Sequence, residues 1–202
     1  RVFRYLKATA GVGLLYGNTN DELNLHCYTD ADYAMDTETR RSITGYVLIC
    51  GGAPVAWRST KQSQVATSTT EAEYIAASMG CREILWGRQL LAELGWKQAN
   101  PTPLHMDSQG AIKLINNAQV HARTKHIDVL YMFVREAQAE AKISVTYVDT
   151  EHQLADALTK PLPRDRFANI RHALSMCAID SGNVHDQTQI IRDDCNRTVH
   201  EK

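Results

Sequence analysis

Four acidic side chains could act together although they lie far apart in the sequence: Asp30, Glu73, Asp107 and Asp156. Each lies at the end of a predicted strand or in the first turn of a predicted helix, and such positions can converge on one edge of a sheet. Convergent carboxylates repel one another strongly unless cations lie between them. Hard oxygen ligands suit Mg²⁺ or Mn²⁺, and two such ions ~3.5–4 Å apart are the usual apparatus for in-line attack of water on a phosphodiester.

Each acid taken alone also has an ordinary explanation. Asp30 and Asp32 are of the type that turns use, and a carboxylate in the first turn of a helix is stabilised by the helix dipole. The whole set of four, in this placement, favours the metal-site interpretation. The sequence therefore predicts a divalent-metal site at one edge of a sheet.

The elements that would position these acids begin with three strands. Apolar residues alternate with polar ones over residues 23–30, which is the period of a half-buried strand and leaves Asp30 on its polar face. Residues 43–50 are apolar and β-rich, and a third strand over 55–59 follows a Gly-Gly turn. Three consecutive strands predict an antiparallel meander.

A long helix is expected after the meander. Thr69 or Thr70 can cap its start, and Gly95 ends it. Apolar residues at helical spacing predict one core-facing stripe along it: Ala72, Ile75, Ala76, Met79, Trp86, Leu90 and Leu94.

The second half of the chain alternates strands with helices. We expect strands over 104–107 and 143–147, and helices after Ser108, over 127–137, after Gln153 and over 167–174. The order β-β-β-α-β-α-α-β-α implies an α/β fold of mixed α+β character, in which a five-stranded mixed sheet carries helices on both faces.

Composition narrows the class of protein. The chain has 202 residues, of which 44% are hydrophobic and 22% charged, as in a soluble globular domain with a substantial core. Its net charge of -1 means that a nucleic-acid partner would need local basic patches. The 5 cysteines include no CxxC pair, which argues against a zinc site or a disulfide framework and fits a reducing compartment. The sequence shows no membrane span and no signal peptide.

Several motifs in order resemble the ribonuclease H domain of retroelements, in particular that of copia-type LTR retrotransposon Pol polyproteins. They are Tyr-Thr-Asp-Ala-Asp-Tyr-Ala (28–34), Arg-Arg-Ser-Ile-Thr-Gly-Tyr (40–46), Ser-Thr-Thr-Glu-Ala-Glu-Tyr-Ile-Ala (68–76), Met-Asp-Ser-Gln-Gly-Ala-Ile (106–112), Arg-Thr-Lys-His-Ile-Asp (123–128) and Leu-Ala-Asp-Ala-Leu-Thr-Lys-Pro-Leu (154–162). Together they span about residues 24–165.

The resemblance implies the ribonuclease H fold and a two-metal-ion activity. The expected reaction is endonucleolytic hydrolysis of the RNA strand of an RNA/DNA hybrid, leaving a 3′-hydroxyl and a 5′-phosphate, with Mg²⁺ as cofactor and Mn²⁺ as a substitute. The four metal-binding acids of the family map to Asp30, Glu73, Asp107 and Asp156. Glu71 is the alternative to Glu73, and we choose Glu73 because the family acid precedes an apolar pair and Ala, as in Glu73-Tyr74-Ile75-Ala76.

Binding of the hybrid is assigned to basic side chains or a partner domain, because the basic helical protrusion of cellular relatives is not evident here. The candidate residues are Arg40, Arg41, Lys61, Arg123, Lys125 and His126, each of which could equally be solvated surface. Cellular relatives also carry a mobile histidine in a loop before the last Asp. His152 lies only four residues before Asp156, so it is either a proton-transfer or product-release residue or a solvated loop histidine.

We divide the chain into a connector at 1–22, which resembles the stretch after reverse transcriptase in copia-type Pol, a ribonuclease H domain at 23–176, and a tail at 177–202 that is expected to be disordered. Because it opens on Arg1 rather than Met, we expect a fragment of a longer polypeptide. The expected partners are the RNA/DNA hybrid and the reverse transcriptase domain of the same polyprotein, with no membrane. The expected location is intracellular, in a cytoplasmic virus-like particle or the nucleus.

Two rival hypotheses stay open. One is an inactive or domesticated ribonuclease H-fold module that binds without turnover. The other is a DNA-cutting relative on the same fold, because a fold does not fix its substrate.

Overall fold

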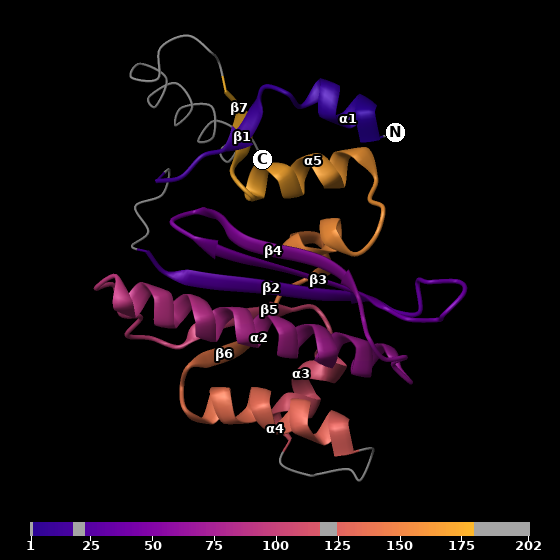
Figure 1. Cartoon of the computed structure of the whole chain (residues 1–202), viewed down its shortest axis with the longest axis vertical. Helices are drawn as coiled ribbons and strands as arrows, with labels where there is room; N and C mark the ends of the chain where they lie inside the picture. Colours follow the sequence, from indigo (N-terminus) through magenta and orange to yellow (C-terminus); the bar gives the residue numbers. More distant parts are fainter. Residues whose placement is uncertain (1, 18–22, 118–124, 180–202) are drawn as a thin grey trace.

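A five-stranded sheet forms the centre of the computed structural model, which describes residues 2–17, 23–117 and 125–179. Its strands run in the order β4-β3-β2-β5-β6 (Figure 1). The bounds are β2 Leu25–Asp32, β3 Ile43–Cys50, β4 Ala53–Lys61, β5 Thr102–Met106 and β6 Ile143–Tyr147. β2, β3 and β4 are the predicted antiparallel meander, while β5 pairs parallel with β2 and β6 pairs parallel with β5. The sheet is therefore mixed, as predicted.

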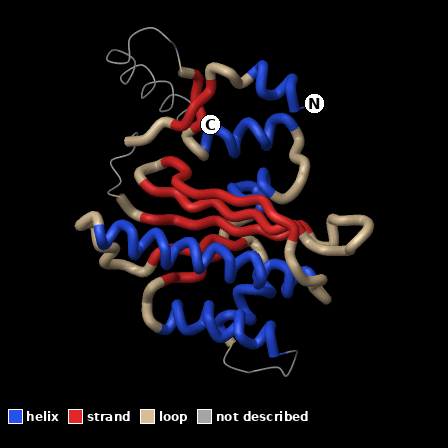
Figure 2. The backbone as a smooth tube through the Cα atoms, in the orientation of Figure 1, coloured by secondary structure: helices blue, strands red, loops and turns tan. Residues whose placement is uncertain are grey.

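Helices cover both faces of this sheet, which also agrees with the prediction (Figures 1 and 2). One face carries α2 Thr69–Glu93, α3 Gln109–Asn116 and α4 Lys125–Ala139. The other carries a short 3₁₀ helix, η2 Leu154–Leu158, and α5 Arg164–Ala173, and a further 3₁₀ turn, η1 Thr150–His152, precedes η2. None of the helices in the described part of the chain is long and apolar enough to cross a membrane.

The core has one part on each face of the sheet, because neighbouring residues of β3 point in opposite directions. Leu48 packs with Ile84 of α2 and Leu104 of β5 in the larger part. Val47 packs with Ile170 of α5 in the smaller part, which also contains Ile49 and Leu154. The smaller part holds η2 and α5 against the sheet, and this packing matters for the site because η2 carries Asp156.

The stripe predicted on α2 is only partly buried. Ala72 and Ala76 are in the core, but Trp86, Leu90 and Leu94 are 54%, 39% and 58% exposed. The C-terminal half of α2 instead turns other residues, such as Gly87, toward the sheet. The prediction of a core role was therefore wrong for the last three residues, because apolar spacing fixes a helical face without fixing which face meets the sheet.

The predicted connector and tail meet in a small second sheet. α1 Val2–Ala8 leads into β1 Val12–Leu14, which pairs antiparallel with β7 Met176–Ala178, so that Gly13 lies opposite Cys177. The boundary predicted at 176/177 thus falls inside a strand. Residues 18–22 of the predicted connector and 180–202 of the predicted tail lie outside the described residues.

Candidate active site

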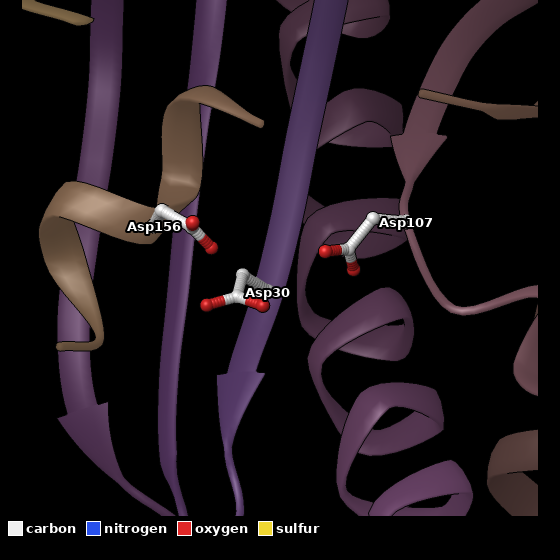
Figure 3. Close-up of side chains that lie close together, drawn as sticks. All are labelled: Asp30, Asp107 and Asp156. Atoms are coloured by element: carbon white, nitrogen blue, oxygen red, sulfur yellow. The ribbon is translucent and has the colours of Figure 1, made fainter. Parts of the chain in front are cut away.

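Three of the four predicted acids lie together at one edge of the central sheet (Figure 3). One carboxylate oxygen from each of Asp30, Asp107 and Asp156 lies within 4.8 Å of the other two. Asp30 and Asp156 are buried, and Asp107 is half-buried. Three oxygen ligands at this spacing can share a divalent cation.

The register of the sheet brings Asp30 and Asp107 level with each other. β2 and β5 are parallel, and Tyr28 pairs with His105. Asp30 comes two residues after Tyr28, and Asp107 comes two residues after His105. Residues two apart along an extended segment point to the same face of the sheet. Adjacent parallel strands end at the same edge, so this pair is a direct product of strand order.

Asp156 reaches the same place from η2, and Gly45 allows it to do so. Gly45 lies opposite Asp30 in the β2–β3 ladder. A Cβ atom built there would lie 2.8 Å from Thr159 Cγ2 and 2.9 Å from Leu158 Cβ. Only a glycine therefore lets η2 lie directly on β3 beside Asp30.

Gln153 fixes the start of η2 to the strand that carries Asp30. Its side chain is fully buried, and its Nε2 donates to the backbone carbonyl of Thr29 at 3.0 Å. Its Oε1 accepts from Ala155 N at 3.2 Å, so the same side chain caps η2. A buried amide with both ends bonded holds its segment firmly in place.

Two hydroxyl groups from the segment 150–166 orient two of the acids. Thr159 Oγ1 donates to Asp30 Oδ2. Thr150 Oγ1 donates to Asp107 Oδ2 at 3.0 Å. A donor fixed on one carboxylate oxygen leaves the other oxygen of that group available as a ligand.

Two cations from the same segment neutralise part of the acidic charge. Lys160 Nζ lies 2.8 Å from Asp156 Oδ1 and 3.8 Å from Asp30 Oδ2. Arg166 Nη2 donates to Asp156 Oδ2 and also to the backbone carbonyl of Thr150. All three acids are therefore contacted by one segment that spans η1, η2 and the start of α5.

Glu73 lies beside this triad, in the second turn of α2, and its ligand atoms fall outside the 4.8 Å group. It is buried, and Ala31 N–H donates to its carboxyl group. Burial, together with the charges of Asp30 and Asp107, raises the pKa of Glu73 to about 9. Its Oε2 has no hydrogen-bond partner among the described residues.

Glu71, the alternative to Glu73, has a different use in the structure. Its Oε2 accepts from Thr67 N at 2.8 Å and from the Thr67 hydroxyl. Its own N–H donates to Ser68 Oγ at 3.2 Å, so Ser68 and the Glu71 carboxylate together cap the start of α2, the first through Glu71 N and the second through Thr67. This geometry gives Glu71 a structural contact at the helix start, and the choice of Glu73 as the fourth acid stays a prediction.

The triad carries more negative charge than its surroundings stabilise. Burial raises the pKa of Asp30, with Asp156 adding to the effect while the Thr159 hydrogen bond and Lys160 oppose it. Burial and the charge of Asp30 likewise raise the pKa of Asp107. Burial alone would lower the pKa of Lys160, but its hydrogen bond to Asp156 and the acidic charges around it raise it. The site therefore favours added positive charge.

The donor set fits a hard divalent cation. It offers carboxylate oxygens from three elements, with the unpartnered Glu73 Oε2 beside them. Carboxylate oxygens suit Mg²⁺ and Mn²⁺, whereas the triad contains no sulfur or imidazole ligand for softer metals.

The residues predicted to bind the hybrid lie partly near this edge. Arg40 and Arg41 precede β3, and Lys61 ends β4 opposite Ile43. Lys61 is ion-paired with Asp36, so part of its positive charge is already neutralised. These assignments stay predictions.

The other predicted hybrid-binding residues are less fully described. Lys125 and His126 lie in the first turn of α4 rather than in a loop, and their side chains are outside the described part. Arg123 lies outside the described residues altogether.

His152 does not contact the triad in the part of the chain that the structure describes. Its side chain is 75% exposed, and its Nδ1 lies 2.7 Å from Asp149 Oδ1. It follows Thr150, whose hydroxyl does contact Asp107, by two residues. A role for His152 in proton transfer or product release stays a prediction.

Sequence motifs did not identify the supporting residues Gly45, Thr150, Thr159, Lys160 and Arg166. Gly45, Thr159 and Lys160 lie inside the motifs quoted above, but no role was assigned to them. The spacing of Asp156 and Lys160 was one available signal, because side chains four apart on a helical turn are neighbours.

Solved structures define the class of this fold. An RNase H1 isolated from compost matches it with a TM-score of 0.52 at 14% identity, covering 68% of this chain and 94% of its own. The structure of an enzyme of the same name in complex with an RNA/DNA hybrid matches with a TM-score of 0.50 at 15% identity, covering 67% and 94%. The protein has the ribonuclease H fold.

The sequence is similar to segments of much longer retrotransposon Pol polyproteins. The chain is 42% identical over 175 residues to a retrovirus-related Pol polyprotein from transposon TNT 1-94 of Nicotiana tabacum, covering 87% of this chain and 13% of that protein. It is 40% identical over 181 residues to the Pol polyprotein from transposon RE2 of Arabidopsis thaliana, covering 89% and 12%. No family model matches the chain. The chain is homologous to a segment of copia-type Pol polyproteins and spans only this small share of their length.

Proposed function

We propose that this protein is the ribonuclease H domain of a copia-type Pol polyprotein and hydrolyses the RNA strand of RNA/DNA hybrids. The observation that carries the proposal is the convergence of Asp30, Asp107 and Asp156, from three separate elements, on a space of 4.8 Å. Two Mg²⁺ ions, or Mn²⁺ in their place, would supply an activated water and stabilise the leaving oxygen there. Asp30, Asp107, Asp156 and Glu73 are the residues that would hold them.

The supporting residues give each acid a fixed position before substrate arrives. Thr159 and Thr150 orient the carboxylates of Asp30 and Asp107, and Gln153 fixes η2 against β2. Such preorganisation matters because a fixed ligand set needs no rearrangement as charge develops on the phosphate.

The hybrid would lie across this acidic edge. Its A-form-like groove and its 2′-hydroxyl groups would select the RNA strand. Basic side chains would contact the phosphates and set the register without reading sequence. We assign this role to Arg40, Arg41, Lys61, Arg123, Lys125 and His126, and we place the reaction beside the reverse transcriptase domain, in a virus-like particle or the nucleus.

The test is cleavage of a labelled RNA/DNA hybrid in Mg²⁺, Mn²⁺ or chelator. The wild-type protein should cut the RNA strand with either metal and should not cut in chelator. Asp30→Asn should abolish cleavage with the fold retained, because the amide oxygen can still accept from Thr159. Asp165→Asn is the matched control, since Asp165 is exposed on α5 and is not one of the three triad acids.

The rival hypotheses predict other outcomes of the same assay. A binding module would retain the hybrid without cutting it under any metal condition. A DNA-cutting relative would cut duplex DNA as readily as the hybrid. Cleavage by Asp30→Asn at the wild-type rate would remove the acid assignment.

A further inference from the structure

Two positively charged side chains lie among the acids, and they are held in different ways. Lys160 bridges acids from two elements, because its Nζ is 2.8 Å from Asp156 Oδ1 and 3.8 Å from Asp30 Oδ2. Arg166 contacts one acid, Asp156, and its guanidinium also donates to the backbone of Thr150.

These contacts give the two cations different freedom to move. Within the described residues, the ion pairs of the Lys160 ammonium are with Asp30 and Asp156, and its side chain is 32% exposed. Lys160 is therefore a flexible point charge with a route to solvent. Arg166 has a planar guanidinium tied to the main chain as well as to Asp156. Arg166 can stay in place while the site changes, whereas Lys160 can swing away.

The Lys160 ammonium lies between two of the acids that a shared divalent ion would have to contact. A cation that bridges Asp30 and Asp156 must approach an oxygen of each, and Lys160 Nζ already does so. The Lys160 ammonium and a divalent ion cannot both lie between Asp30 and Asp156, because like charges at contact distance repel strongly.

We propose that Lys160 is a built-in counter-ion that holds Asp30 and Asp156 together in the metal-free protein and is displaced when a divalent ion binds between them. This inference rests on the proposed function, since it concerns the same acids. It adds a role for a residue outside the ligand set: Lys160 sets the metal affinity of the site and stabilises the site before metal arrives. Lys160 is a positioning residue here, and Arg166 remains the fixed partner of Asp156.

Removing the Lys160 charge should have opposite effects in the two states. In chelator, Lys160→Met leaves the buried acids with less neutralising charge, so the Tm should fall. Wild type must break the ion pairs of Lys160 when Mg²⁺ binds, whereas the variant has none to break. Mg²⁺ should therefore bind the variant on the order of tenfold more tightly, allowing for the partial exposure of the lysine. The rise in Tm on adding Mg²⁺ should therefore be larger for the variant than for wild type.

The experiment is calorimetric titration of the full chain with Mg²⁺ and with Mn²⁺, together with Tm measurements in chelator and in metal. Lys97→Met is the matched control, because it makes the same charge change at an exposed position at the opposite end of β2 and β5. Tighter binding by Lys160→Met, with Lys97→Met equal to wild type, supports the proposal. Equal or weaker binding by Lys160→Met overturns it.

A second measurement needs no variant and covers the case in which Lys160→Met does not fold. Amine-reactive labelling of wild-type protein, read by peptide mass spectrometry, should increase at Lys160 when Mg²⁺ is added and stay constant at Lys97. Unchanged or reduced labelling of Lys160 in saturating Mg²⁺ overturns displacement.

The outcomes also separate this inference from the proposed function. Metal binding and hybrid cleavage by wild type, with no change in the Mg²⁺ affinity of Lys160→Met, would leave the nuclease standing and refute the role of Lys160. Tighter binding by Lys160→Met without hybrid cleavage by any form would support the counter-ion and refute the nuclease. An absence of metal binding by wild type and variant alike would refute both.

Discussion

Replacement of Gly45 by alanine would test whether close contact between η2 and β3 builds the acid cluster. The added Cβ would lie 2.8 Å from Thr159 Cγ2, 2.9 Å from Leu158 Cβ and 3.0 Å from Ala155 O. Contacts this short cannot be tolerated unless η2 moves by a few tenths of an ångström or more. Asp156 and Thr159 would move with it, away from Asp30.

The magnitude follows from the kind of contact. Overpacking a buried site by one methyl group typically costs ~1–3 kcal/mol of unfolding free energy. The upper half of that range is expected, since one of the three clashing atoms is a backbone oxygen and cannot turn aside. The Mg²⁺ affinity should fall by more than the loss of folding stability explains, because the geometry of the ligands is itself changed.

Thr159→Ser provides a specific rescue. It removes the methyl group that lies closest to the new Cβ and keeps the hydroxyl that donates to Asp30. The double variant should therefore recover part of the loss, which a double-mutant cycle measures as a favourable coupling of ~0.5 kcal/mol or more.

The assay is urea unfolding in chelator combined with Mg²⁺ titration. Gly11→Ala is the control, because a Cβ at Gly11 would meet no atom of the described residues nearer than Ile179 O at 3.9 Å. The reasoning would be refuted if Gly45→Ala unfolded like Gly11→Ala and bound Mg²⁺ like wild type. It would also be refuted if Thr159→Ser failed to couple with Gly45→Ala.

Two further predictions concern the glutamates of α2. The folded protein keeps a proton on Glu73 up to a pKa of about 9, whereas the unfolded chain loses it near 4.5, so in chelator the stability should fall as pH rises between those values. The slope from this group approaches ~1.4 kcal/mol per pH unit, and Glu73→Gln should reduce it in urea unfolding at pH 5 to 8; a slope that is unchanged by Glu73→Gln would contradict the assignment. Glu71→Ala should lower the unfolding free energy by ~0.5–2 kcal/mol through loss of the cap at Thr67, and an unchanged urea midpoint would show that this cap is not formed.

The facing of Asp30 could be predicted because it depends on a local pattern. The alternation over residues 23–30 gave the face of Asp30, and the pairing of β2 with β5 then places Asp107 level with it. Strand bounds differ by about two residues, since β2 continues to Asp32, so Asp30 lies just inside the strand rather than at its last position. A shift in the bounds of a strand leaves the facing of its residues unchanged, whereas a one-residue slip in the pairing register would turn Asp30 to the other face.

Contacts that depend on tertiary packing could not be predicted in the same way. No local pattern indicates that Thr150 will meet Asp107 or that Arg166 will meet Asp156, because the turns of the segment 150–166 decide both. The same holds for the pairing of β1 with β7, because no local pattern indicates that residues 12–14 will meet residues 176–178.

The segment 150–166 is the element that turns a common sheet edge into a specific site. Strand order alone brings two acids, Asp30 and Asp107, to one edge, and two carboxylates in water would be only modestly perturbed. The segment adds Asp156 to the cluster and covers it, which strengthens every electrostatic interaction there by excluding water. It also supplies the hydroxyl donors and the cations that keep the acids together. A change within this segment should therefore alter metal affinity even where the sheet is intact, whereas a change in the sheet core should alter stability first.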